Sequence, residues 1–99
     1  MQTINANLQY KINASDLGVI LALVRAGNLA GAGDRLGNDA STVFRTVQRI
    51  EKGLGQRLFE RSRAGYRPSE LAQELAQHAE QVEEQLEAAQ SAAQLRTCP

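Results

Sequence analysis

Cysteine, histidine and aromatic residues are scarce in this sequence, and each shortage excludes a class of protein. The single cysteine, Cys98, cannot form a disulfide within the chain, which excludes a disulfide scaffold and fits a reducing cytoplasm. One cysteine and one histidine, His78, do not make a zinc site. The sequence also lacks a nucleophile–base pair and a phosphate-binding loop. We therefore predict no enzyme, no metal and no cofactor.

Long apolar runs are missing as well. The longest run, residues 19–24, is far shorter than the roughly 20 residues that cross a membrane. The first ten residues have no basic segment ahead of an apolar one, so no secretory signal peptide is expected. The length of 99 residues suits one small domain. These features predict a cytoplasmic protein without membrane contact.

The net charge is formally zero, but charges of opposite sign are separated along the chain. Residues 35–67 carry eight basic and three acidic side chains, a net charge of +5. Residues 68–99 carry six glutamates and one arginine, a net charge of −5. A basic segment followed by an acidic one is typical of a DNA-contacting module with a solvated accessory helix. The pattern indicates a nucleoid-associated protein.

Three helices are expected in the first two thirds of the chain, after a polar N-terminal arm at 1–14 that we predict to be flexible. Apolar residues recur at helical spacing, and Asn28 and Asp39 can cap the second and third helices. Gly27 and Gly37 mark helix ends. The predicted ranges are 15–26, 29–36 and 40–53.

The third predicted helix has two different faces. One is a narrow apolar stripe made of Val43, Val47, Ile50 and Leu54. The opposite face consists of Ser41, Phe44, Arg45, Gln48 and Lys52. It holds hydrogen-bonding groups and cations, with one acid, Glu51, near its edge. Such a face suits a helix that lies in the major groove of DNA.

After the third helix the apolar period changes from helical to alternating. Residues 57–61 and 66–68 read as two short strands around a turn at 62–65. Ser69 can cap a fourth helix that runs to about residue 95. The predicted fold is mainly α, a winged helix-turn-helix with three helices and a two-stranded wing, followed by a long linker helix. Its parts are the arm 1–14, the DNA-binding domain 15–68, the linker and dimerisation helix 69–95 and a tail 96–99.

The fourth predicted helix carries apolar residues at alternating spacings of four and three, which is a coiled-coil pattern. The seam is Leu75, Ala79, Val82, Leu86, Ala89 and Ala93. About 26 helical residues span roughly 39 Å, more than so small a domain covers. We therefore predict that this helix dimerises with a second copy of the chain.

The motifs at Gly27-Asn28-Leu29, Leu54-Gly55 and Leu58-Phe59-Glu60-Arg61 resemble the N-terminal domain of LysR-type transcriptional regulators. The resemblance covers residues 16–82, and LGQRLFER at 54–61 is its most specific part. It implies a homodimer joined through linker helices and an inverted-repeat operator. The family's Ser-Gln-Pro-Ala-Val-Ser-Arg stretch is replaced here at 39–45, and its Thr-x-Ala-Gly is replaced at 69–72.

The family also has an effector-binding domain beyond the linker helix, and this sequence stops before it. Whether the sequence is a truncated piece or a natural short form stays open. A small-molecule effector is expected only if such a domain exists.

Candidate DNA contacts lie on the second and third helices and on the wing. Arg45 can make two hydrogen bonds to a guanine, with Ser41 beside it. Phe44 either touches a thymine methyl group or packs beside Val47 at the edge of the core. The full set is Asn28, Ala40, Ser41, Thr42, Phe44, Arg45, Gln48, Arg49, Arg61, Arg63 and Arg67, in which Asn28 and Thr42 are candidates for phosphate and the wing arginines for phosphate or the minor groove.

Two other functions fit the same pattern. One is a different winged-helix regulator, similar to the molybdate-responsive ones. The other is a winged helix that serves only for contact between proteins. A steep loss of DNA binding with added salt separates a DNA-binding protein from the second alternative.

Overall fold

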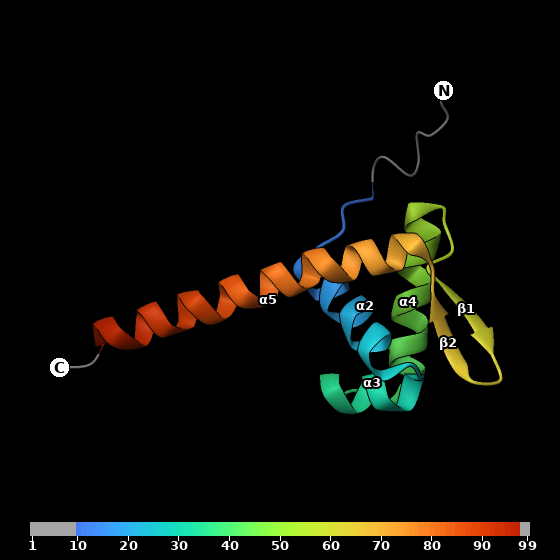
Figure 1. The fold of residues 1–99 in the computed structure, drawn as a ribbon, viewed down its shortest axis with the longest axis horizontal. Helices are drawn as coiled ribbons and strands as arrows, with labels where there is room; N and C mark the ends of the chain where they lie inside the picture. Colours follow the sequence, from blue (N-terminus) through green and yellow to red (C-terminus); the bar gives the residue numbers. More distant parts are fainter. Residues whose placement is uncertain (1–9, 98–99) are drawn as a thin grey trace, which may run out of the picture.

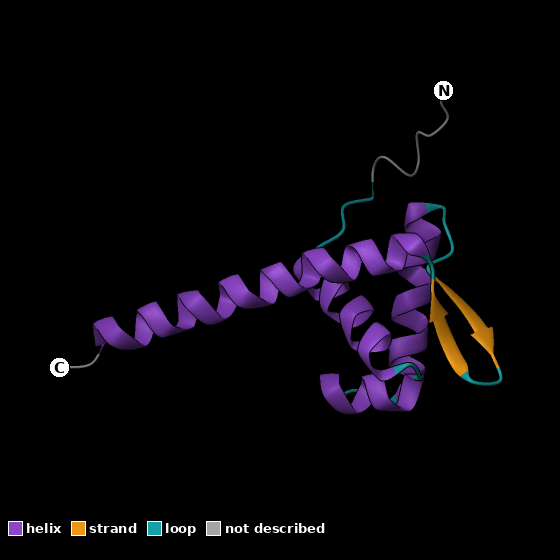
Figure 2. Ribbon diagram, viewed as in Figure 1, coloured by secondary structure: helices purple, strands orange, loops and turns teal. Residues whose placement is uncertain are grey.

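The computed structural model describes residues 10–97. In this range the chain forms helices and one antiparallel hairpin, as predicted for a mainly α winged helix-turn-helix (Figures 1 and 2). The elements are α2 (Ala14–Ala26), α3 (Leu29–Leu36), α4 (Ala40–Leu54), β1 (Phe59–Ser62), β2 (Gly65–Pro68) and α5 (Glu70–Thr97).

Side-chain caps set the helix starts. The side chains of Asn13, Asn28 and Asp39 each accept a hydrogen bond from the backbone N–H three residues later, at 2.8, 2.6 and 2.9 Å. Ser69 accepts from the N–H of Ala72 at 3.1 Å. Three helices end on a glycine in the left-handed conformation, namely Gly27, Gly37 and Gly55. The caps at Asn28, Asp39 and Ser69 confirm the expected starts of α3, α4 and α5.

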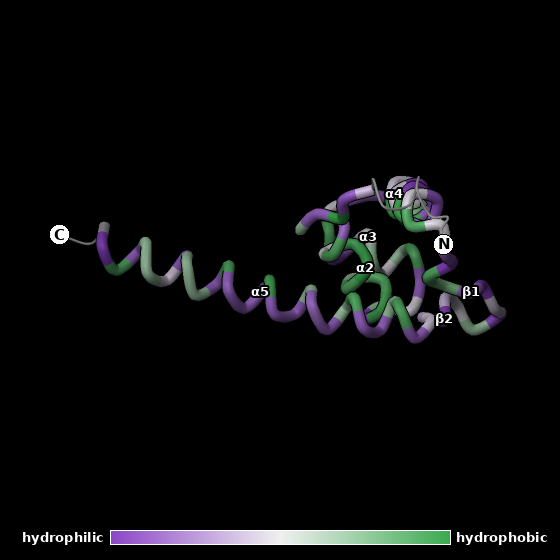
Figure 3. The backbone as a smooth tube through the Cα atoms, turned by 90° about the horizontal axis from the view of Figure 1, so that it is seen from above, coloured by the Kyte–Doolittle hydropathy of each residue, from purple (hydrophilic) through white to green (hydrophobic). Residues whose placement is uncertain are grey.

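Helix α2 lies at the centre of the fold, between α4 and the first half of α5. Ile20 and Leu23 are fully buried beside Val43 and Ile50 of α4, where the predicted apolar stripe faces inward. On the other side of α2, Leu21 packs against α5. Residues 19–23 are therefore all buried, and Figure 3 shows α2 as the most continuously apolar helix.

The first half of α5 packs on its own domain, which corrects part of the predicted dimer seam. Ala79 is 4% exposed and lies with Ala76 against Leu21 of α2. Leu75 packs against the main core. The reason is an alanine stripe at 72, 76 and 79 that lets α2 approach closely and overlaps the coiled-coil pattern. The seam residues not used by the core are Val82, Leu86, Ala89 and Ala93.

The structure also corrects the flexible arm. Residues 1–9 lie outside the described part, but Tyr10 and Ile12 pack against the core. The Tyr10 hydroxyl donates a hydrogen bond to the buried carboxylate of Asp16 at 2.6 Å. Its ring covers Gly53 so closely that a Cβ there would overlap it. The end of the predicted arm is thus part of the folded domain.

The wing is anchored at both of its strands. Glu51 of α4 accepts hydrogen bonds from the backbone N–H groups of Leu58 at 2.7 Å and Phe59 at 3.2 Å. The N–H of Tyr66 donates a hydrogen bond of 2.8 Å to the carbonyl of Gly27, the C-cap residue of α2. Tyr66 also meets Phe59 edge to face, with ring centroids 6.4 Å apart. These contacts fix the hairpin beside α4.

Candidate nucleic-acid interface

The face of α4 that points away from the core has the composition expected for a recognition helix. Ser41, Arg45 and Gln48 are exposed, while Ala40 and Thr42 are half-buried. Arg45 forms no ion pair within residues 10–97. Arg45 therefore offers a cation on this face without a carboxylate paired to it.

The N-terminus of α4 is held by Asp39. Its carboxylate accepts from the N–H of Thr42 and from the Ser41 hydroxyl, the latter at 3.0 Å. These hydrogen bonds, those of Thr42 first, lower the pKa of Asp39. The Thr42 carbonyl in turn accepts from the Thr46 hydroxyl at 2.9 Å. Asp39 thus orders the first turn of α4, where base contacts are expected.

Arg49, placed among the candidate DNA contacts, has a partner inside the chain. Its guanidinium lies 3.1 Å from Asp16 Oδ1 and donates to the Tyr10 hydroxyl at 3.3 Å. Asp16 raises the pKa of Arg49, and burial is the main cause of a raised pKa of Tyr10. The Asp16 side chain is 2% exposed, so the arginine compensates a buried charge. The sequence analysis did not single out Asp16 and missed this cluster.

Asn28 is likewise used by the fold. Besides accepting from the N–H of Gly31, its amide donates to the carbonyl of Ala26 at 3.3 Å. The side chain is exposed at the start of α3. The Asn28 amide, predicted to contact phosphate, thus already forms two hydrogen bonds within the chain.

The three wing arginines are exposed but differ in surroundings. Arg63 lies in the two-residue turn between the strands, where the register pairs Ser62 with Gly65. Arg67 pairs across the hairpin with Glu60. Arg61 turns back toward α4, with its guanidinium over the rings of both Phe44 and Tyr66. The wing thus extends the cationic surface of α4.

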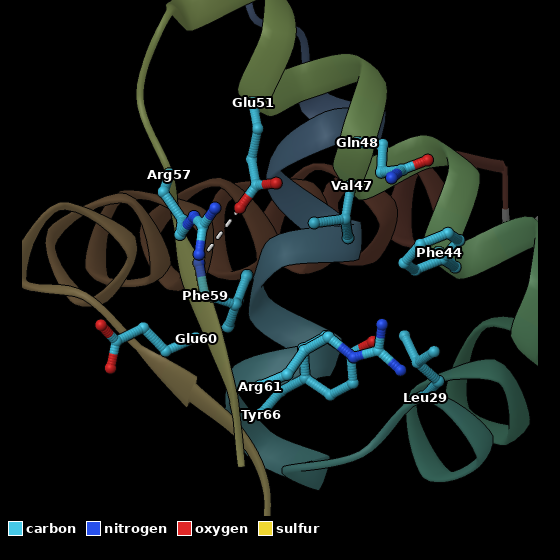
Figure 4. A pocket seen from close by; sticks show the side chains of 10 residues that line it. All are labelled: Leu29, Phe44, Val47, Gln48, Glu51, Arg57, Phe59, Glu60, Arg61 and Tyr66. Carbon is cyan, nitrogen blue, oxygen red and sulfur yellow. Dashed lines mark hydrogen bonds between the residues drawn. The ribbon is translucent and has the colours of Figure 1, made fainter.

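An open hollow of about 510 Å³ separates α4 from the wing (Figure 4). Phe44 and Gln48 line it from α4, and Arg61 and Tyr66 line it from the hairpin. Tyr66, which the sequence analysis did not single out, has a buried hydroxyl without a hydrogen-bond partner among residues 10–97. Of the predicted DNA contacts, the hollow brings together Phe44, Gln48 and Arg61, whereas the others do not line it.

Leu86, Ala89 and Ala93 lie on the part of α5 that extends beyond the domain, whereas Val82 lies where the helix still borders α2 (Figure 1). Val82 is half-buried, whereas Leu86 is 62% exposed and Ala89 and Ala93 are exposed. The guanidinium of Arg25 on α2 lies 3.2 Å from the carboxylate of Glu83 and 3.7 Å from that of Glu80. These ion pairs attach α5 to the domain just before the helix extends away from it.

The family model for bacterial regulatory helix-turn-helix proteins of the lysR family matches residues 14–73. This chain belongs to that family. The resemblance noted in the sequence is therefore confirmed, and the chain carries a LysR-type DNA-binding domain.

Solved structures of the same family have the same fold. CbnR, a LysR family transcriptional regulator, is 28% identical over 86% of this chain, with a TM-score of 0.70. Full-length OxyR C199D from Pseudomonas aeruginosa is 25% identical over 86%, with a TM-score of 0.74. The chain covers 29% of either protein. The DNA-binding domain of CbnR in complex with DNA is 24% identical, with a TM-score of 0.72 and coverage of 87% of this chain and 99% of that one.

No curated protein matches the chain. Among residues 10–97, no helix combines the length and apolarity needed to cross a membrane. The same residues include no group of three or more His, Cys, Asp or Glu side chains arranged to hold a metal ion.

Proposed function

We propose that this chain binds double-stranded DNA in a sequence-specific manner, with α4 in the major groove and the wing beside it. The observation that carries the proposal is the shared surface of the two elements. Phe44 and Gln48 of α4 and Arg61 of the hairpin line one open hollow. DNA-binding winged helices need such a surface, because phosphate contacts set the register and base contacts select the sequence.

The proposal extends to assembly. A single module of this size buries only roughly 600–1,000 Å² on DNA, which gives little selectivity. Two copies joined through the extended half of α5 would read two half-sites, and a two-fold dimer requires an inverted-repeat operator. The exposed Leu86 on this half of α5 supports the pairing.

We assign the chain a regulatory role in the bacterial cytoplasm, at the nucleoid, and no catalytic one. The longer family members CbnR and OxyR extend well beyond the matched domain. A small-molecule effector would act through such a further domain rather than through residues 10–97.

Replacing Arg45 tests the recognition helix. Arg45→Ala should weaken binding to a duplex selected from random sequences by about 1–3 kcal/mol if the guanidinium reads a base. Binding to random duplexes should change less. Fluorescence anisotropy with both duplexes measures this, and circular dichroism checks the helix content.

Arg96→Ala is the matched control for Arg45→Ala, because it removes the same charge from the far end of α5. It should bind both duplexes as the wild type does. Wild-type affinity of Arg45→Ala for the selected duplex would remove this residue from the base-reading set.

The wing gives a second prediction. Arg63→Ala should weaken binding to all duplexes alike and reduce the slope of log affinity against log salt by about 0.9, the value for one phosphate contact. Titrations at several salt concentrations measure the slope. An unchanged slope and affinity would make the wing turn a scaffold without contact to DNA.

The alternative from another functional class is a winged helix that binds only proteins. It predicts no salt-dependent affinity of the wild-type chain for any duplex. A wild type without such affinity would contradict the proposed function.

A further inference from the structure

Arg61 lies between two aromatic rings that come from different elements. Its guanidinium carbon is 5.9 Å from the ring centroid of Phe44 on α4 and 5.9 Å from that of Tyr66 on β2. Arg61 and Tyr66 are partners across the hairpin. Both distances fall within the roughly 6 Å at which an aromatic face attracts a cation. Phe44 and Tyr66 thus form an aromatic clamp around the charge (Figure 4).

The charge of Arg61 remains available to an outside acceptor. The side chain is exposed and forms neither an ion pair nor a side-chain hydrogen bond in the described part of the chain. The ring contacts are not hydrogen bonds, so they leave the five N–H donors of the guanidinium without an acceptor among residues 10–97. The clamp therefore orders the arginine without consuming its hydrogen bonds.

The acids near the hollow do not compete for this charge. Glu51 accepts hydrogen bonds from the N–H groups of Leu58 and Phe59. Glu60, next to Arg61 on β1, also lines the hollow, but its carboxylate points away from the Arg61 guanidinium in Figure 4. An anion that enters between α4 and the wing meets Arg61 as a pre-ordered cation.

We propose that the aromatic clamp positions Arg61 to contact the DNA phosphate strand that passes between α4 and the wing. This inference rests on the proposed function, since a protein with a helix in one groove and a wing at the next must straddle the strand between them. Arginine suits the task because its fork of donors matches phosphate oxygens. Phe44 is then a positioning residue, and neither contact with a thymine methyl nor core packing is its main role.

A double-mutant cycle tests the clamp. Affinities for the selected and for random duplexes are measured at several salt concentrations for the wild type, Phe44→Leu, Arg61→Ala and the double variant. Arg61→Ala should reduce the salt slope by about 0.9. Phe44→Leu should weaken binding to all duplexes by about two- to fivefold, the equivalent of one exposed cation–π contact. In the Arg61→Ala background it should have no further effect, because the residue that it positions is gone.

Phe44→Tyr is the conservative control, since it keeps the ring and should retain wild-type affinity. Thermal unfolding verifies that each variant folds, and Phe44→Met replaces Phe44→Leu in the cycle if the latter does not.

Additive losses in the cycle would overturn the clamp, as would a change in base preference caused by Phe44→Leu. If the wild type binds DNA in a salt-dependent way and the losses are additive, only the clamp fails. If the wild type binds no duplex, the proposed function fails and the clamp fails with it.

Discussion

Leu86→Glu should convert the chain from a dimer into a monomer and abolish tight binding to an inverted-repeat operator. Leu86 is 62% exposed on the part of α5 that extends beyond the domain. Burying that exposed part against a second copy contributes about 1–2 kcal/mol per copy. The variant loses this from both copies, about 2–4 kcal/mol in total, and adds a carboxylate at each position that has no partner. The dimer dissociation constant should rise by roughly 30- to 1,000-fold.

Light scattering at matched concentrations measures the assembly, and anisotropy on full and half operators measures the consequence. The variant should keep the domain fold, because the core contacts of α5 end near Ala79. It should also keep weak half-site binding. Ser91→Glu is the control, since position 91 lies on the opposite side of the helix and should leave the dimer intact. A wild type that is monomeric, or a Leu86→Glu variant that stays dimeric, would show that this helix does not join the copies.

The elements that the sequence predicted well are those set by local chemistry. The side chains of Asn28 and Asp39 accept hydrogen bonds from backbone N–H groups only three residues away. The starts of α3 and α4 can therefore be predicted without knowledge of the fold. The stripe that includes Val43 and Ile50 is equally local, because it needs only the helical period. The first strand begins at Phe59, two residues later than predicted, because the backbone N–H groups of Leu58 and Phe59 donate hydrogen bonds to Glu51 of α4.

What the sequence did not show depends on contacts between distant residues. The bond from Arg49 to Asp16 joins residues 33 positions apart, and Tyr10 lies 39 positions from Arg49. Arg49 lies outside the apolar stripe of α4, and the sequence gives no information on a carboxylate from α2. The sequence analysis therefore included Arg49 among the candidate DNA contacts.

Helix α5 shows a different kind of ambiguity. Ala79 belongs both to the coiled-coil spacing and to the alanine stripe with Ala72 and Ala76. The sequence pattern does not tell whether the residue packs against a second copy or against its own domain. The fold decides in favour of α2, which covers the residue completely enough to leave it 4% exposed. The proposed dimer surface is consequently shorter than the seam predicted from the sequence and lies toward the C-terminal half of the helix.

Gly65→Ala should detach the wing and destabilise the domain. Gly65 has φ +127°, a backbone conformation that L side chains rarely adopt, and a Cβ there would overlap the carbonyl oxygen of Gly27. The backbone strain alone costs about 1–3 kcal/mol. The carbonyl of Gly27 must also move, and it accepts the 2.8 Å hydrogen bond from Tyr66 that anchors β2, whose loss costs about 1 kcal/mol more. At about 4–8 °C per kcal/mol for a domain of this size, Tm should fall by more than about 8 °C.

Gly18→Ala is the matched control, because it adds the same methyl group where the structure has room for it. Apart from its chain neighbours and the backbone of its own helix, α2, no atom lies within 4 Å of a Cβ at position 18. Alanine is favoured over glycine there by about 1 kcal/mol, so Tm should rise or stay constant. Differential scanning calorimetry compares the two variants, and the salt slope of DNA binding reports the wing. The carbonyl that anchors β2 belongs to Gly27, which also ends α2. Gly65→Ala should therefore lose both thermal stability and the phosphate contact of the wing. An unchanged Tm with a wild-type salt slope would mean that Gly27 does not hold the wing in place.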